Sequence, residues 1–279
     1  MSTPLNAAAA SPARTSRIAA IQMVSGPVVA GNLDVAGGLI AAAAAKGAQL
    51  VALPEYFAIL GMKDTDKVDA REAPGDGPIQ AFLSNAAKQH GIWIVGGSAP
   101  LTSSDPRKVR NSSLVYDASG KLVARYDKIH LFGFQMGEER YHEASTIEPG
   151  DKPVTVDTPF GRLGLSICYD LRFPELYRSM KDVDIILVPS AFTETTGRAH
   201  WETLLRARAI ENLAYVLAPA QGGRHANGRE THGDSMIIDP WGSVLDRLPQ
   251  GAGVVMADIH LDRMQGLRHN LPALSHRTM

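Results

Sequence analysis

Short apolar runs alternate with longer amphipathic stretches along most of the chain, and this alternation limits the possible folds more than any other feature of the sequence. The short runs are rich in β-branched residues and predict strands, whereas the longer stretches repeat apolar residues at helical spacing. The expected helices cover Leu33–Lys46, Ile79–His90, Pro174–Met180 and Ala199–Leu213. The expected strands cover Arg17–Met23, Gln49–Leu53, Gly91–Gly97, Ser113–Tyr116, Val123–Tyr126, Val154–Val156, Leu163–Cys168, Ile185–Val188, Tyr215–Ala218, Met236–Ile238 and Val254–Ala257.

Three turn sequences separate neighbouring strands of this pattern: Asp117-Ala118-Ser119-Gly120, Pro159-Phe160-Gly161 and Asp239-Pro240-Trp241-Gly242. Gly, Pro and Asp at such positions are typical of hairpins, which join antiparallel strands. Strands interleaved with both helices and hairpins indicate mixed sheets with helices packed outside them. We therefore expect an α/β fold.

The charges of the chain nearly cancel, because 28 Lys and Arg residues stand against 29 Asp and Glu residues and leave a net charge of −1. Nothing in this balance suggests a nucleic-acid or membrane partner. The longest aliphatic run, Leu39–Ala45, is far too short to cross a bilayer. The composition is that of an ordinary globular protein.

Residues 1–16 are mostly Ala, Ser, Thr and Pro and lack the apolar segment of a secretory signal. We expect a disordered tail there; an organellar transit peptide is the alternative. Residues 17–279 are expected to form a single domain, since no stretch resembles a linker and no repeat of fixed period occurs. A chain with one cysteine forms no intrachain disulfide, which agrees with a reducing, cytoplasmic location.

The single cysteine, Cys168, lies where an expected strand meets an expected helix. Pro174, six residues later, is tolerated in a first helical turn. A thiol at such a junction points out of the sheet toward helix N–H groups, and these favour the thiolate over the thiol. The plain alternative is a buried structural cysteine, which behaves as a small inert hydrophobe.

Two carboxylates and one lysine complete a candidate site. Glu55 ends the apolar run Leu50–Pro54, at a point where ligand-facing loops begin in open α/β sheets, and Lys128 ends an amphipathic strand. Glu143 falls in an expected loop. Each has a plain alternative, namely a solvated loop residue, a solubilising edge lysine and a surface residue. Together with Cys168 they supply what amide hydrolysis requires: a nucleophile, a proton carrier and a cation for the oxyanion.

Other chemistries find less support. No Gly-x-Ser-x-Gly occurs, and Thr146 interrupts the His-Glu-x-x-His pattern that begins at His142. There is neither a Walker A sequence nor a Gly-x-Gly-x-x-Gly, so nucleotide binding is unsupported. A papain-like Cys–His pair stays open, because the chain contains nine histidines.

Glu55, Lys128 and Cys168 follow one another in sequence contexts that resemble the nitrilase superfamily of carbon–nitrogen hydrolases. The segments that carry this resemblance are Leu53–Phe57, Tyr126–Phe132 and Ile167–Leu176, and the similarity extends from about Ile18 to Arg277. The resemblance implies a four-layer αββα sandwich with mixed sheets inside and helices outside. It also implies a homodimer or larger homo-oligomer, and Pro174–Met180 with Ala199–Leu213 is the contact we expect.

In such proteins Cys168 would be the nucleophile, Glu55 the general base and Lys128 an oxyanion stabiliser, helped by the backbone N–H of Tyr169. Glu143 resembles the additional active-site glutamate, because a Pro-Gly pair ends the same stretch; Glu138 and Glu139 are nearby alternatives. The resemblance implies no metal and no organic cofactor.

The run Cys-Tyr-Asp-Leu-Arg-Phe at Cys168 resembles the amidase branch, since true nitrilases typically show Cys-Trp-Glu. Four further segments are similar to the group of deaminated glutathione amidases: Ala220–His225, Gly233–Met236, Asp239–Gly242 and Leu267–Pro272. Asp234 departs from this pattern, where His or another polar residue is expected.

Four residues are expected to bind substrate. Arg172 lies four residues past the nucleophile, within reach of a substrate carboxylate, although a structural salt bridge is the alternative. By resemblance, Phe192 and Thr196 line the acyl pocket. Arg224 belongs to a polar loop that we expect to meet the far end of a longer, peptide-like substrate.

The main expectation is an amidase that hydrolyses the primary amide of deaminated glutathione to a free acid and ammonia through a cysteine thioester. The family's repair reaction implies 2-oxoglutarate and Cys-Gly as products. One alternative is an ω-amidase acting on 2-oxoglutaramate or 2-oxosuccinamate. Another is a catalytically idle interaction protein on the same scaffold, which the intact Glu55, Lys128 and Cys168 argue against.

Overall fold

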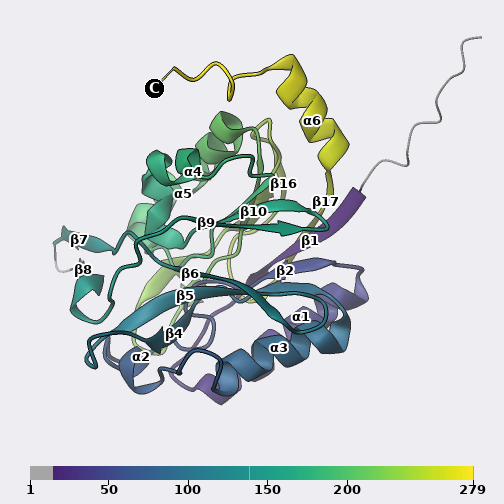
Figure 1. The fold of residues 1–279 in the computed structure, drawn as a ribbon. Helices are drawn as coiled ribbons and strands as arrows, with labels where there is room; N and C mark the ends of the chain where they lie inside the picture. The colour runs from purple at the N-terminus through teal and green to yellow at the C-terminus, as the bar shows by residue number, and fades with distance from the viewer. Residues whose placement is uncertain (1–14, 138, 279) are drawn as a thin grey trace, which may run out of the picture.

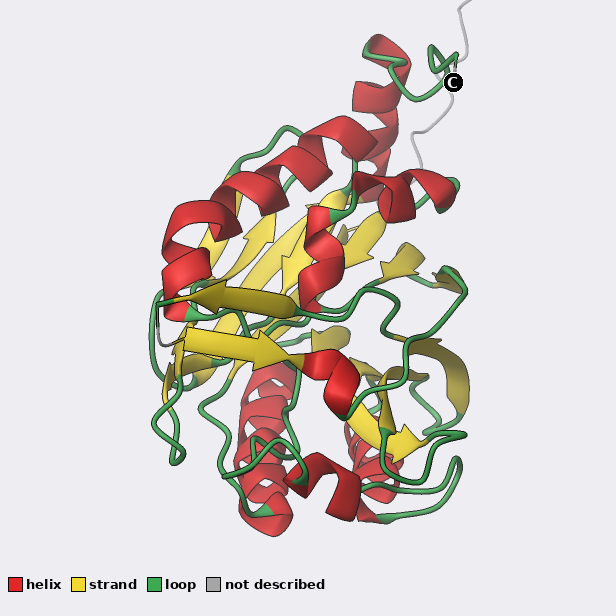
Figure 2. Ribbon diagram, turned by 90° about the vertical axis from the view of Figure 1, so that its left-hand side faces the viewer, coloured by secondary structure: helices red, strands yellow, loops and turns green. Residues whose placement is uncertain are grey.

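Two sheets pack face to face between two layers of helices in the computed structural model, which describes residues 15–137 and 139–278 (Figure 1). Figure 2, turned by 90°, shows the helix–sheet–sheet–helix order from the side. The αββα sandwich expected from the sequence is thereby confirmed. The helices are α1 (Val29–Ala45), α2 (Asp66–Asp69), α3 (Pro78–His90), α4 (Pro174–Ser179), α5 (Glu194–Asn212) and α6 (Leu261–Asn270), and 3-10 turns lie at η1 (Glu143–Ser145) and η2 (Cys168–Arg172).

The first sheet has seven strands in the order β17-β1-β2-β3-β5-β4, with β6 paired to β5. Ile18 and Ala20 of β1 belong to the apolar cluster between the sheets, whereas Ala19 and Ile21 pack with α1 and α3. Both faces of the strand are therefore buried, which explains its continuous apolar run. The strands are β1 (Thr15–Gln22), β2 (Leu50–Ala52), β3 (Trp93–Val95), β4 (Ala99–Thr102), β5 (Val109–Tyr116), β6 (Leu122–Asp127) and β17 (Gly253–His260).

The second sheet has the order β16-β15-β12-β11-β10-β9. Helices α4 and α5 cover its outer face, and Leu176, Trp201 and Leu205 join the same apolar cluster as its strands (Figure 1). Its strands are β9 (Val154–Thr158), β10 (Gly161–Leu165), β11 (Ile185–Leu187), β12 (Tyr215–Ala218), β15 (Ser235–Ile238) and β16 (Val244–Leu248).

Each sheet contains three parallel strands at its centre, β1-β2-β3 in the first and β10-β11-β12 in the second. The loops that follow the carboxyl ends of such strands gather at one edge of a sheet. Glu55 follows β2 and Cys168 follows β10, so the topology itself assembles the site. Two small ribbons lie outside the sheets: β7 (Gly133–Met136) with β8 (Glu139–His142), and β13 (Gly222–Arg224) with β14 (Glu230–His232).

Every helix and strand expected from the sequence overlaps an observed one, and the three turn sequences join β5 to β6, β9 to β10 and β15 to β16. Thr15 and Ser16, which we assigned to the tail, are instead the first residues of β1; the rest of that tail lies outside the described residues. Among residues 15–137 and 139–278, no helix combines the length and hydropathy that a membrane crossing requires.

Candidate active site

Glu55 lies just beyond the carboxyl end of β2 and is 1% exposed. The loop that contains it packs against the chain after β3, where Gly97 has φ of +48° and approaches the Pro54 carbonyl oxygen. A Cβ atom at Gly97 would lie 2.0 Å from that oxygen, so only glycine permits the contact. The position of Glu55 therefore depends on the close packing of two strand ends.

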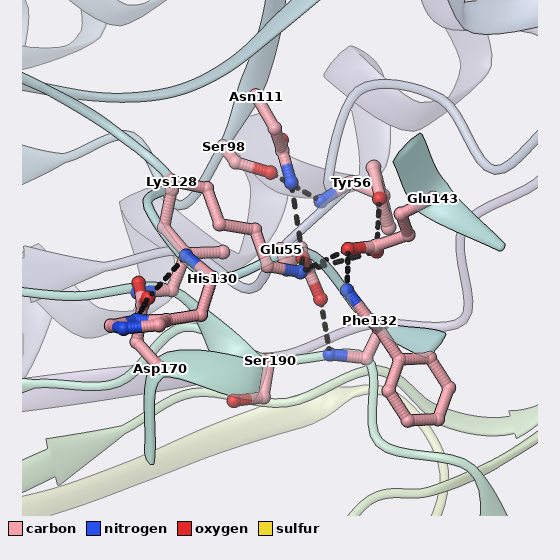
Figure 3. A network of polar contacts seen from close by, with 12 residues as sticks. Glu55, Tyr56, Ser98, Asn111, Lys128, His130, Phe132, Glu143, Asp170 and Ser190 are labelled. Atoms are coloured by element: carbon pink, nitrogen blue, oxygen red, sulfur yellow. Dashed lines mark hydrogen bonds and ion pairs between the residues drawn. The ribbon is translucent and has the colours of Figure 1, made fainter. Parts of the chain in front are cut away.

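Lys128 follows β6 and is fully buried. Its N–H donates to the Asn111 carbonyl oxygen at 3.0 Å, and its own carbonyl oxygen accepts from Gly150 N–H at 2.8 Å. The ammonium donates to Glu55 Oε1 at 2.8 Å and to Glu143 Oε2 at 2.8 Å, as Figure 3 shows. One buried ammonium therefore lies between two carboxyl groups.

The two carboxylates accept further hydrogen bonds that hold them in place. On Glu143 these bonds stabilise the ionised form, because they are donated to its oxygens. The four donors are the Tyr56 hydroxyl (2.8 Å) and Phe132 N–H (2.8 Å) to Glu143, and Asn111 Nδ2 (3.0 Å) and Ala191 N–H (3.0 Å) to Glu55.

Cys168 is the first residue of η2, and its φ of +50° is unusual for a residue other than glycine. Its N–H donates to the Pro189 carbonyl oxygen, which follows β11, at 2.9 Å. A sharp turn of this kind after a strand presents the side chain at the end of the sheet, as in the strand–turn–helix elbow of serine hydrolases. The predicted junction at Cys168 is confirmed, with a 3-10 turn before α4.

Asp170 couples the Cys168 turn to the Lys128 segment. Its fully buried carboxylate accepts from Ile167 N–H at 2.8 Å, from the Tyr126 hydroxyl at 2.7 Å and from His130 N–H at 3.0 Å. Tyr126 and His130 flank Lys128 in the chain, and Figure 3 shows His130 beside Asp170. One carboxylate therefore fixes the distance between the two segments.

Burial raises the pKa of the Cys168 thiol well above its usual range, and the charge of Glu55 adds to the rise. The charge of Lys128 and the Ala191 N–H act in the opposite direction without outweighing these effects. The expectation that helix N–H groups favour the thiolate is therefore wrong. A single short turn offers too little positive potential to compensate for burial beside carboxylates.

Lys128 and Glu143 are both held in their charged forms. Burial lowers the pKa of Lys128, but the charges of Glu143 and Glu55 outweigh it and raise that pKa overall. Burial raises the pKa of Glu143, but the charge and hydrogen bond of Lys128 lower it overall. Burial, Glu143 and Glu55 raise the pKa of Tyr56 well above its usual range, so its hydroxyl stays a donor.

A pocket with about 270 Å³ of empty space lies over Cys168. Lys128 lies behind Glu55 and Glu143 and does not line it. No histidine is among the described residues that line this pocket, so the structure gives no support to a papain-like Cys–His pair. The predicted site residues that do line it are Glu55, Glu143, Cys168, Tyr169, Arg172, Phe192 and Thr196.

Arg172 has no carboxylate partner within the described ranges, which argues against the structural salt bridge considered above. Its guanidinium carbon lies 5.8 Å from the centre of the Tyr169 ring and 5.5 Å from that of Phe192. One nitrogen is 3.2 Å from His200 Nδ1. Aromatic rings on two sides orient a cation that is available to an anionic ligand.

Arg224 does not take the place expected of it. In the β13–β14 ribbon it pairs with Glu230 in register, and its side chain is exposed and lines no part of the pocket. Alternation along the ribbon turns it outward. The arginine of this loop that reaches the pocket is Arg229, whose Nη2 donates to the Ala191 carbonyl oxygen at 2.8 Å.

Asp234 supports the pocket from behind rather than lining it. It forms an ion pair with Arg247, and its carbonyl oxygen accepts from Trp201 Nε1 at 2.8 Å. The Trp201 ring in turn packs 4.9 Å from the ring of Phe192. Asp234 therefore reaches the acyl pocket only indirectly, through Trp201 and then Phe192.

Of the two alternatives to Glu143, Glu139 lies in β8 and accepts from the Thr195 hydroxyl at 2.8 Å, whereas Glu138 lies outside the described residues. Among the described residues, no cluster of three or more His, Cys, Asp and Glu side chains is arranged to bind a metal ion.

Sequence reasoning did not find several residues of this network. Tyr56 could have been predicted from the sequence, since it follows Glu55 in the same motif. Asn111 lies in a part of β5 that the pattern did not predict. Phe132 and Ala191 contribute backbone N–H groups, which no side-chain type signals.

The sequence model of the carbon-nitrogen hydrolase family matches residues 17–269. The chain belongs to the carbon-nitrogen hydrolase family. Among its relatives in this family, the deaminated glutathione amidase of Synechocystis sp. is 43% identical over 265 residues, which are 93% of this chain and 97% of the relative.

Two crystal structures extend the likeness to the fold. The NitFhit protein of C. elegans superposes with a TM-score of 0.86 at 39% identity over 95% of this chain, which spans 65% of that longer one. Saccharomyces cerevisiae Nit3, a member of branch 10 of the nitrilase superfamily, gives a TM-score of 0.85 at 30% identity, with 95% and 97% of the two chains covered. The resemblance to the nitrilase superfamily is thereby confirmed.

Proposed function

We propose that this carbon-nitrogen hydrolase is an amidase that cleaves deaminated glutathione through a thioester on Cys168. The observation that carries the proposal is the placement of Cys168 in one pocket with Glu55 and Glu143, both bound to the buried Lys128. The name of the Synechocystis relative supplies the substrate.

In the acylation step Glu55 takes the thiol proton as the Cys168 sulfur attacks the amide carbon. The raised pKa of the thiol makes this proton transfer part of the attack, rather than a step completed in the resting enzyme. Glu143 stays ionised and holds the Lys128 ammonium. The two carboxylates thus divide the work, one moving protons and the other fixing the cation.

The oxyanion formed by this attack needs preorganised donors. Lys128 lies behind the two carboxylates and already donates to both, so it stabilises the oxyanion through its positive charge, which also acts on the Cys168 sulfur. The Tyr169 N–H supplies a donor, since it donates to no acceptor among the described residues. These assignments complete the roles expected from the sequence.

The leaving group of this substrate differs from the ammonia that we expected from the sequence. In deaminated glutathione the scissile amide nitrogen belongs to Cys-Gly, so the substrate has no primary amide and releases no ammonia. The C–N bond breaks as protonated Glu55 gives its proton to the Cys-Gly nitrogen, and a 2-oxoglutaryl thioester remains on Cys168. Water, deprotonated by Glu55, then attacks the thioester carbonyl, and 2-oxoglutarate leaves while the thiol is restored.

Arg172 is suited to the 2-oxo acid end of this acyl group. A guanidinium can bind a carboxylate through two hydrogen bonds, and Arg172 has no competing carboxylate among the described residues. Phe192 and Thr196 line the adjoining wall. An acyl chain with a terminal carboxylate therefore fits the pocket.

The substrate assignment is tested by comparing kcat/KM for deaminated glutathione and for 2-oxoglutaramate with the wild-type protein. We expect a preference for deaminated glutathione. A large preference for 2-oxoglutaramate would favour the ω-amidase alternative, which shares the acyl group but releases ammonia. Unchanged turnover in Cys168→Ala would defeat the catalytic assignment altogether, and no turnover by the wild type would favour the idle scaffold.

The remaining expectations stay proposals. We propose a homodimer or larger homo-oligomer that forms through α4 and α5, because these helices cover one outer face of the sandwich (Figure 1). A cytoplasmic location also remains a prediction, which subcellular fractionation of the native host tests. The reaction as written uses groups of this chain, its substrate and water.

A further inference from the structure

A second pocket adjoins the pocket of Cys168. The two share Phe132, Glu143 and Arg229 as lining residues, so Glu143 stands at the boundary between them. The second pocket is the larger, with about 520 Å³ of empty space, and α2, the segment before it and the β13–β14 loop form its far side. None of the roles proposed above uses this space.

Lys67 of α2 lies in the wall of the second pocket with an incomplete set of partners. Its side chain is only 14% exposed, and its ammonium donates to Thr146 Oγ1 at 3.2 Å. The nearest carboxylate is that of Asp64, 3.9 Å away on a side chain that is 81% exposed. Burial lowers the pKa of Lys67 despite the charges of Asp64 and Glu143. An anion in the pocket would compensate for this desolvation.

The charges around the second pocket are predominantly positive. Lys63, Lys67 and Arg229 face it against Asp64 and Glu143, and Glu143 also binds Lys128. The Nε of Arg229 is buried without a hydrogen-bond partner, and its guanidinium carbon lies 4.9 Å from the centre of the Tyr141 ring. Among the described residues that line the pocket, the lysines and the arginine thus outnumber the carboxylates.

We propose that the second pocket binds the Cys-Gly portion of deaminated glutathione and that the Lys67 ammonium receives its terminal carboxylate. This inference rests on the proposed function and adds the subsite that separates a dipeptide leaving group from ammonia. Arg229, at the boundary, faces the peptide between the two pockets.

Tyr56 connects the shared boundary of the two pockets with Lys67. Its hydroxyl lies 2.8 Å from Glu143 Oε1 and its ring centre 5.6 Å from Lys67 Nζ. Two extended residues reach about 7 Å. A Cys-Gly portion that leaves the Cys168 pocket past the shared Glu143 therefore enters the pocket that Lys67 lines.

The test combines enzyme and substrate changes. Deaminated glutathione, its analogue with a C-terminal carboxamide, and 2-oxoglutaramate are compared in the wild type and in Lys67→Met. We expect Lys67→Met to lower kcat/KM for deaminated glutathione by about 10- to 100-fold, mainly through KM, because a charge-assisted hydrogen bond is lost. The wild type should lose a similar factor on the carboxamide analogue, and Lys67→Met should lose little more on it.

Two matched variants separate binding from structure. Lys67→Arg should recover part of the loss, whereas Lys152→Met, which removes the same charge from an exposed position outside both pockets, should change kcat/KM by less than about threefold. Equal losses of Lys67→Met on all three substrates, or full activity of the wild type on the carboxamide analogue, would overturn the inference while leaving the proposed function intact. If the wild type does not hydrolyse deaminated glutathione, the proposed function fails and the inference fails with it.

Discussion

At the scale of single residues, the protonation state of Cys168 follows from its neighbours rather than from its place at a turn. Its thiol shares a pocket with two carboxylates that are bound to one ammonium, and burial removes the water that would stabilise a thiolate. The raised pKa makes the resting nucleophile a thiol. A base within the site is then required, which is the role we propose for Glu55.

This protonation state predicts the pH dependence of alkylation. A raised pKa means that the thiolate fraction near pH 7 is small and grows about tenfold per pH unit until the pKa is reached. We expect the rate of iodoacetamide labelling of Cys168, followed by intact mass, to rise in this way between about pH 7 and pH 9. Since Cys168 is the only cysteine, the reading is unambiguous. A rate that is already maximal at pH 7 would show that the thiolate is the resting form.

The sequence predicts the groups that carry charge but not those that position them. Glu55, Lys128 and Cys168 each stand in a short local motif, so their proximity follows once the fold is known. The sequence does not show which of Arg224 and Arg229 reaches the pocket, because the two differ only in which side of a short ribbon they face. That orientation depends on register, which composition does not encode.

At the scale of elements, the site depends on close contacts between strand ends. Glu55 is placed by the loop after β2, and Gly97 after β3 supports that loop through contact with the Pro54 carbonyl. Asp170 couples the Lys128 and Cys168 segments in the same manner. Both arrangements join segments from different parts of the chain.

Replacement of Gly97 therefore tests whether this contact matters for catalysis. Gly97→Ala adds a collision with the Pro54 oxygen to the cost of a positive φ, whereas Gly75→Ala, at φ of +85°, meets no atom within 4 Å. We expect Gly75→Ala to lower the free energy of unfolding by about 1 kcal/mol and Gly97→Ala by at least about 2 kcal/mol more. Urea unfolding measures both. Only Gly97→Ala should also lower kcat, and equal effects of the two variants would contradict this view.

The long elements could be read from the sequence because burial on one or both faces leaves a periodic apolar pattern. The ribbons β7–β8 and β13–β14 could not, because each of their strands is only three or four residues long, too short for an apolar pattern to show. Strand β4 contains Pro100 and lies at the edge of its sheet, where a proline is tolerated but obscures the pattern. Helix α6 buries only Leu261 and Met264, too few residues for a recognisable apolar stripe.

At the scale of the whole molecule, helices cover both outer faces of the sandwich. Helices α1 and α3 cover the first sheet, whereas α4 and α5 cover the second (Figure 1). Ile210 of α5 is 49% exposed, and the nearby turn with Gly242 packs against it beside Trp241, which is 61% exposed. We place the proposed interface here because two large apolar side chains are exposed next to each other, as in an interaction patch.

The proposed oligomer is therefore tested at Ile210. Ile210→Asp should reduce the mass measured by size-exclusion chromatography with light scattering to that of one chain, because an unpaired charge would be buried in the interface. Val35→Asp, at a position 48% exposed on α1, is the matched control and should leave the mass unchanged. A wild-type protein that is already monomeric would contradict the proposal.

The decisive observation is the covalent intermediate itself. Wild-type protein is mixed with deaminated glutathione, quenched with acid during turnover and analysed by intact mass and peptide mapping. We expect a 2-oxoglutaryl group on Cys168, identical to the group that 2-oxoglutaramate leaves there, since the two substrates differ only in the portion that departs. An adduct that still contains Cys-Gly, an acyl group on another residue, or turnover without any adduct on Cys168 when deacylation is rate-limiting would contradict the mechanism.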